Sequence, residues 1–97
     1  MTPVKRIEIV VTSLAVPRIT EALGRAGLTA WTVVRDVAGV GDRGVRAGDE
    51  LTDVDRNGLV VAACQPEQLA RVVDEVRPLL KRFGGICLVS DASWVLH

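Results

Sequence analysis

The residues best suited to binding chemistry lie in a glycine-rich, charged segment in the middle of the chain, which begins Gly39-Val40-Gly41-Asp42-Arg43-Gly44. Glycines allow positive φ and let backbone N–H groups approach an anion closely. Arg43 and Arg46 add forked side-chain donors that suit phosphate, carboxylate or bicarbonate. Eight charged residues fall within 42–56, which is unusual for a loop in a small domain unless the loop binds a ligand or is disordered. We therefore expect function at this loop.

Other interpretations of the loop are open to comparison. The spacing Gly39-x-Gly41-x-x-Gly44 formally matches a dinucleotide fingerprint, but that motif has to open a helix, and residues 45–55 lack helical periodicity. Asp53 and Asp55 could touch a cation only weakly, so no metal site is expected. A simpler alternative stays open, in which the arginines of the loop pair with neighbouring acids and the loop binds nothing.

A second basic, glycine-ended segment is Lys81-Arg82-Phe83-Gly84-Gly85. Its cations and glycines could hold a second part of an anionic ligand. Because the segment follows a predicted helix, Lys81 and Arg82 could equally stabilise the negative end of the helix dipole.

Apolar patterns of period two and period 3.6 predict the elements that must position these segments. The predicted elements are strands over 4–12, 28–37, 59–64 and 86–90, and helices over 17–26 and 66–83. Pro78 should kink the second helix or close it near Arg77. Residues 94–96 should form a short edge strand or lie across a neighbouring subunit.

This order of elements predicts an α+β fold, a ferredoxin-like βαββαβ sandwich. The chain would form one domain over 1–97, with a long loop at about 40–56 between its second and third strands. Both helices would cover the same face of the sheet. Val10, Val34 and their neighbours would leave an apolar surface on the other face, so we expect the protein to oligomerise.

Composition narrows the classes of function. Twelve basic and twelve acidic residues give a net charge of zero, which argues against nucleic acid as a partner. No apolar run approaches the roughly 18 residues of a membrane span, and no signal peptide is visible, so we expect a cytoplasmic protein that is not inserted in a membrane. Cys64 and Cys87 are expected to be buried, reduced thiols. The only histidine, His97, ends the chain, so no catalytic triad and no enzyme is expected.

Several segments, taken in order, resemble the P-II signalling proteins over nearly the whole chain. They are Lys5-Arg6-Ile7-Glu8-Ile9-Val10, Glu21-Ala22-Leu23, Leu28-Thr29-Ala30-Trp31-Thr32-Val33, Gly39-Val40-Gly41, and 60–64 with the helix after it. Members of that family form trimers with nucleotide sites in the clefts between subunits. Their long loop, called the T-loop, rearranges with the ligand and docks on transporters or enzymes. The resemblance therefore implies a homotrimer that binds an adenine nucleotide.

The resemblance also implies a set of nucleotide ligands by position. Thr32 would face the adenine or ribose, and Ala63 and Cys64 would line the base pocket. The phosphates would meet Gly39, Gly41, Asp42, Arg43 and Gly44 of the T-loop, and Lys81, Arg82, Gly84 and Gly85 of a neighbouring subunit.

Departures from the family pattern indicate a branch. The chain has no tyrosine, so the tyrosine modification of nitrogen-sensing members is impossible. The second phosphate loop lacks its usual lysine, and the chain stops before the usual C-terminal arginines, so ATP should lose its advantage over ADP or AMP. Leu88-Val89-Ser90-Asp91-Ala92 and the short T-loop resemble the P-II-like branch linked to inorganic carbon, including the carboxysome-associated P-II proteins.

That branch implies a sensor without a cofactor. Bicarbonate would bind beside ADP or AMP, held by Arg43 and Arg46, and the ordered T-loop would control a bicarbonate transporter or another carbon-fixation partner.

Competing classes remain. An amino-acid or 2-oxoacid sensor on the same architecture would need no long charged loop. A weak nucleotide hydrolase, or an acylphosphatase-like enzyme, would want an arginine-bearing loop directly after the first strand, where Thr12-Ser13-Leu14-Ala15-Val16 has none. A trimeric metal-tolerance protein would show more metal ligands.

Overall fold

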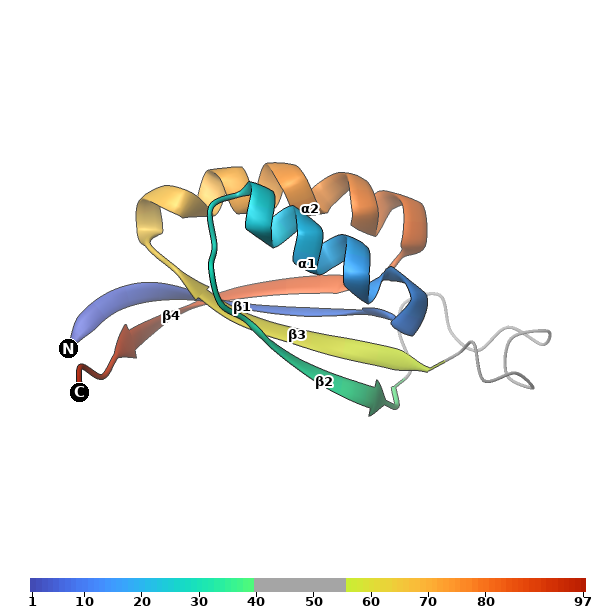
Figure 1. The fold of residues 1–97 in the computed structure, drawn as a ribbon, viewed down its shortest axis with the longest axis horizontal. Helices are drawn as coiled ribbons and strands as arrows, with labels where there is room; N and C mark the ends of the chain where they lie inside the picture. The colour runs from blue at the N-terminus through green and yellow to red at the C-terminus, as the bar shows by residue number, and fades with distance from the viewer. Residues whose placement is uncertain (40–55) are drawn as a thin grey trace.

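The computed structural model describes residues 1–39 and 56–97. Its elements are β1 (Thr2–Thr12), a short 3-10 helix (Ser13–Ala15), α1 (Val16–Arg25), β2 (Thr32–Val37), β3 (Asn57–Cys64), a second 3-10 helix (Pro66–Gln68), α2 (Leu69–Phe83) and β4 (Ile86–Trp94). The strands form one antiparallel sheet in the order β2-β3-β1-β4, and both helices cover the same face of it (Figure 1). The predicted ferredoxin-like α+β fold is confirmed.

Helix α1 packs through the stripe that the sequence predicted, since Ile19, Ala22 and Leu23 are fully buried. It ends at Gly27, whose φ of 98° is one that glycine adopts without strain. The N–H of Leu28 donates to the carbonyl of Leu23 at 3.0 Å, which completes a Schellman motif. Because Leu28 is tied to the helix end, the chain must first descend to the sheet. Strand β2 therefore begins at Thr32, and the predicted start at residue 28 was wrong.

Helix α2 runs without interruption through Pro78 to Phe83. The expected end near Arg77 was wrong. An interior proline costs a helix about 3 kcal/mol through one lost hydrogen bond and a steric clash. Here Val76 is buried before the proline, and Phe83 packs on the core after it. The apolar stripe is thus anchored on both sides of Pro78, and tertiary packing outweighs the local penalty.

The two faces of the sheet differ sharply. Alternate residues of β1 and β3 pack under the helices in a continuous apolar core that includes Ile7, Ile9 and Val60. The residues between them point to the helix-free side, which we call the open face: Val10, Val34, Leu59, Val61, Ile86 and Leu88. Val34, Ile86 and Leu88 are 45%, 43% and 58% exposed there. A four-stranded sheet with one apolar face uncovered is a surface that normally needs a partner.

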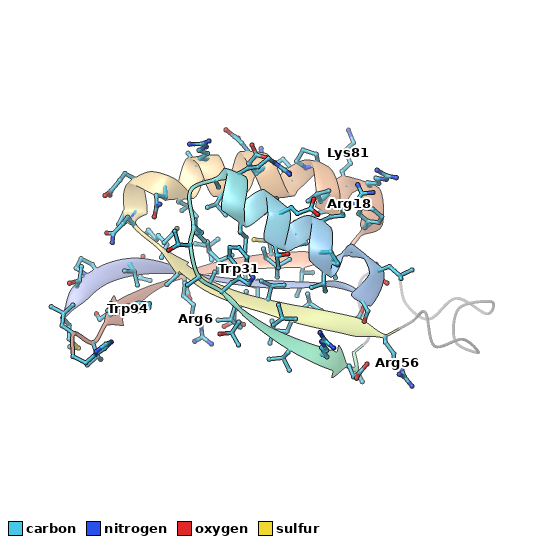
Figure 2. All side chains as sticks on the ribbon, viewed as in Figure 1. Arg6, Arg18, Trp31, Arg56, Lys81 and Trp94 are labelled. Atoms are coloured by element: carbon cyan, nitrogen blue, oxygen red, sulfur yellow. The ribbon has the colours of Figure 1, made fainter. Side chains whose placement is uncertain are left out.

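One ion pair lies within the open face. The Arg6 guanidinium and the Glu8 carboxylate are 2.7 Å apart on neighbouring same-face positions of β1. Figure 2 shows Arg6 extending from the sheet on the side away from the helices. The pair gives an otherwise apolar surface a fixed polar position.

Strand β4 is longer than predicted. It continues past Ser90 to Trp94, because β1 begins at Thr2 and offers backbone partners as far as a Trp94–Thr2 pair. The edge strand expected at 94–96 is thus, at Trp94, the end of β4. The two chain ends lie together at this end of the sheet, opposite the end where β2 stops (Figure 1).

The turn between α2 and β4 yields a stability prediction. Gly85 has a φ of 103°, and a Cβ added there would lie 2.4 Å from the carbonyl oxygen of Val10. We expect Gly85→Ala to lower the free energy of unfolding by about 2 kcal/mol or more, since both strain and a backbone clash oppose it.

Urea unfolding followed by circular dichroism measures this change. Gly39→Ala is the matched control, because nothing lies within 4 Å of a Cβ added at Gly39. Equal unfolding midpoints for the two variants would contradict this account of the turn.

Candidate functional site

A hollow of about 470 Å³ opens at the end of the sheet where the chain termini lie. We call it the terminal hollow. The α1–β2 connection forms one wall, the end of β3 another, and the last residues of the chain a third. Its lining residues are Thr2, Val4, Gly27, Leu28, Thr29, Ala30, Ala63, Cys64, Gln65, Gln68, Trp94 and Leu96. No charged side chain is among these lining residues, so the hollow suits a flat, neutral group with a few hydrogen-bonding atoms.

Two of the predicted site residues meet in this hollow. Ala63 and Cys64 close β3, and both line the hollow as expected for a base pocket. Thr32 does not line it. Thr32 begins β2 opposite Val61, on the open face, and its side chain is exposed.

The remaining described site residues lie at the opposite end of the sheet. Lys81 and Arg82 occupy the last turn of α2, and Gly84 and Gly85 join that helix to β4. Ile86 pairs with Val10, which also pairs with Leu59. Cys64 is five residues further along β3, or roughly 16 Å away at the usual strand rise. One chain therefore keeps the base pocket and the basic turn apart.

Gly39 is at that same opposite end but at the other edge of the sheet. It follows β2, whereas the turn of Gly84 and Gly85 precedes β4, and β3 and β1 lie between them. Three strand spacings amount to roughly 14 Å. Gly41, Asp42, Arg43, Gly44 and Arg46 lie outside the described residues.

The structure places the basic residues where both of their interpretations are satisfied. Lys81 and Arg82 are cations at a helix C-terminus, where they oppose the helix dipole. The Arg82 guanidinium also lies 4.9 Å from the centre of the Phe83 ring. This contact holds Arg82 at the end of α2 and leaves its donors on the protein surface.

Both thiols are free, and burial raises the pKa of each. For Cys64, the carboxylate of Glu67 raises the pKa further, and the ammonium of Lys5 lowers it in part. Cys87 is only half-buried, so the expectation of two fully buried thiols holds for Cys64 alone. Raised pKa values keep both groups protonated near neutral pH, which makes them poor nucleophiles.

Sequence reasoning missed three residues of the terminal hollow, namely Gln65, Gln68 and Trp94. Gln65 and Gln68 carried a usable signal, because a Gln-x-x-Gln spacing around Pro66 is typical of a helix start. Trp94 carried none, since its place in the hollow depends on the pairing of β4 with β1. Within 1–39 and 56–97, no three potential metal ligands gather into a cluster. In those same ranges, no helix is long and apolar enough to cross a membrane.

Comparison with known proteins identifies close structural relatives. The family model for nitrogen regulatory protein P-II matches residues 4–96. CPII from Thiomonas intermedia K12, solved with ADP and bicarbonate, shares 25% identity at a TM-score of 0.80, over 95% of this chain and 88% of its own. A protein described as PII-like in signaling, from Thermus thermophilus, shares 24% identity at a TM-score of 0.77, over 97% of this chain and 91% of its own.

A third solved structure is more distant. GlnK of B. subtilis in complex with ATP shares 15% identity at a TM-score of 0.66, over 96% of this chain and 85% of its own. Its likeness concerns the fold. Among curated protein sequences, none matches this chain significantly.

The protected thiols give a prediction. In the native protein at pH 8, we expect both cysteines to react with a disulfide reagent at least several-fold more slowly than a free thiol, and to react fully once the protein is unfolded. Because the folded-state pKa values are raised, the stability they contribute is present below the unfolded pKa of about 9 and falls as the pH rises above it. Fast labelling of the native protein would contradict the burial described for Cys64.

Proposed function

This chain belongs to the P-II family of nitrogen regulatory proteins, and on that basis we propose that it is a non-enzymatic sensor that binds ADP or AMP. The observation that supports this most is the terminal hollow. It is neutral, contains Ala63 and Cys64, and has a volume suited to a nucleobase. The relative from Thiomonas that was solved with ADP and bicarbonate supports the choice of ligands.

The nucleotide would bind between two copies of the chain. A neutral hollow can receive a base, but the charge of a diphosphate requires cations or backbone N–H groups. In the described residues of one chain, Lys81, Arg82 and the following glycines are at the far end of the sheet. A second copy can bring that end against the terminal hollow of the first. The proposed site is thus shared by two subunits, with Thr32 near the ribose or base.

The open face supports a closed homotrimer as the assembly. Its exposed valine, isoleucine and leucine side chains would be buried between sheets, where each fully buried side chain contributes roughly 1.5–3 kcal/mol. The Arg6–Glu8 pair would set the register, because a buried ion pair needs its hydrogen bonds met in one arrangement only.

We assign the phosphates to the T-loop, at about 40–56, together with the basic turn. Gly39, Gly41 and Gly44 would offer backbone N–H groups, and Asp42 and Arg43 would complete the loop's contacts with the ligand. Lys81, Arg82, Gly84 and Gly85 would add the second half. With no lysine after Gly85, ATP would gain little over ADP or AMP.

Bicarbonate is the proposed second ligand, held by Arg43 and Arg46. Fixing each loop residue costs roughly 1–2 kcal/mol of backbone entropy, so two ligands that order the same loop would bind with positive cooperativity. The ordered T-loop would then present a surface to a partner, which we propose is a bicarbonate transporter or another protein of carbon fixation, in the manner of carboxysome-associated members.

Assembly through the open face can be tested with one substitution. We expect the wild-type protein to be a trimer and Leu88→Glu to be largely monomeric, because a carboxylate at the centre of an apolar interface is strongly unfavourable. Light scattering after size exclusion measures the mass of each. Leu14→Glu is the control, since Leu14 is also exposed but lies in the 3-10 helix after β1, away from the open face. A Leu88→Glu trimer would exclude this interface.

The ligands can be tested by calorimetry. We expect ADP and AMP to bind the wild-type protein, and bicarbonate to raise their affinity about five-fold or more. Arg46→Ala should leave ADP binding intact and remove the bicarbonate effect. The sensor proposal fails if no adenine nucleotide binds with or without bicarbonate. Turnover of the nucleotide would favour the weak hydrolase instead.

A further inference from the structure

We propose that Gln68 and Trp94 make the terminal hollow selective for adenine over guanine. Neither residue belongs to the motifs that carry the P-II resemblance. The inference rests on the proposed nucleotide binding and deepens it, because it says how one base is distinguished from another.

The side-chain amide of Gln68 is held in a single orientation. The backbone N–H of Gln65 donates to Oε1 of Gln68 at 2.8 Å. An N–H can donate only to the oxygen of an amide, so the assignment of Oε1 and Nε2 follows from this bond. The bond also ties Gln68 to the start of the 3-10 helix before α2, which restricts rotation of the side chain.

The other end of the same amide faces the hollow. Gln68 lines the hollow, and so does Gly27. The position of a Cβ added at Gly27 would be 3.6 Å from Nε2 of Gln68, which puts the amide nitrogen beside that wall. Nε2 has two N–H donors and no acceptor. The hollow therefore offers a fixed hydrogen-bond donor to whatever enters it.

Trp94 provides an aromatic surface in the same hollow. It lies at the end of β4, paired with Thr2, and is 50% exposed (Figure 2). An aromatic ring at the mouth of a neutral pocket offers a surface on which a flat base can stack. Trp31, the other tryptophan, does not line the hollow, and its ring lies against Gly24 of α1.

A fixed donor distinguishes the two purines. On its Watson–Crick edge, adenine carries an acceptor at N1, whereas guanine carries an N1–H donor in the same place. The Nε2 donor of Gln68 can bond to adenine N1, but guanine would bring two donors together. A site that leaves polar groups unpaired with the wrong ligand discriminates strongly against it. Stacking on Trp94 adds affinity for either purine, so the selectivity comes from Gln68.

Gln68→Glu tests the donor while keeping the fold. A glutamate oxygen can still accept the Gln65 N–H, so the start of α2 is preserved, but Nε2 is replaced by an acceptor. In calorimetric titrations, we expect wild-type protein to bind ADP at least ten-fold more tightly than GDP. In Gln68→Glu, we expect ADP to bind about ten-fold more weakly and the ADP to GDP ratio to fall to one or below.

A charge control separates recognition from repulsion. Ala70→Glu adds the same negative charge two residues away, at an exposed position that does not line the hollow. Repulsion of the phosphates would weaken ADP and GDP equally, so Ala70→Glu should keep the wild-type ratio.

Trp94 can be followed by its own fluorescence. Trp31→Phe leaves Trp94 as the only tryptophan, since the chain has two. We expect ADP to quench its emission, and Trp94→Ala to weaken ADP about ten-fold with little change in the ADP to GDP ratio.

The outcomes distinguish this inference from the function on which it rests. ADP binding with an unchanged ratio in Gln68→Glu, and with unchanged Trp94 emission, overturns the inference and leaves the sensor intact. Wild-type protein that binds neither ADP nor GDP overturns both. A wild-type preference for GDP also overturns the inference, because the donor would then face the wrong edge.

Discussion

Helices cover only one face of the sheet, and the rest of the account depends on this constraint. The apolar core needs α1 and α2 on one side, where Ile7, Ile9 and Val60 are fully buried. No described element is left for the other side, where Val34 and Leu88 remain exposed. Burial of such side chains is the dominant favourable term in both folding and association. The proposed trimer therefore completes the burial that a single chain leaves unfinished.

The same constraint links assembly to ligand binding. In this topology, the connection from α1 to β2 lies at one end of the sheet, and the turn from α2 to β4 lies at the other. A single chain thus offers a neutral hollow at one end and a basic turn at the other. A nucleotide has a neutral base and charged phosphates, and contact between two chains is what would join the two halves. Bound nucleotide would then stabilise the assembly, and the assembly would form the site.

The fold was largely predictable because local and tertiary preferences agree. The stripe of α1, its stop at Gly27 and the alternation in β1 each had one consistent interpretation, and each was confirmed. Errors arose where distant parts of the chain decide. Packing on both sides of Pro78 kept α2 continuous, and pairing with Thr2 extended β4 to Trp94. Of the expected site, the sequence placed Ala63 and Cys64 in the hollow correctly. It could not reveal Gln68 and Trp94 as their neighbours, since only the folded chain brings those residues together.

The central claim is that two chains share one nucleotide, and native mass spectrometry of the protein with increasing ADP tests it most directly. The account predicts that ADP appears only on trimers, with up to one nucleotide for each of the three interfaces. It predicts no ADP on the monomers present at low protein concentration. Monomers that carry ADP at the same nucleotide concentration, or trimers that never acquire it, would contradict the account.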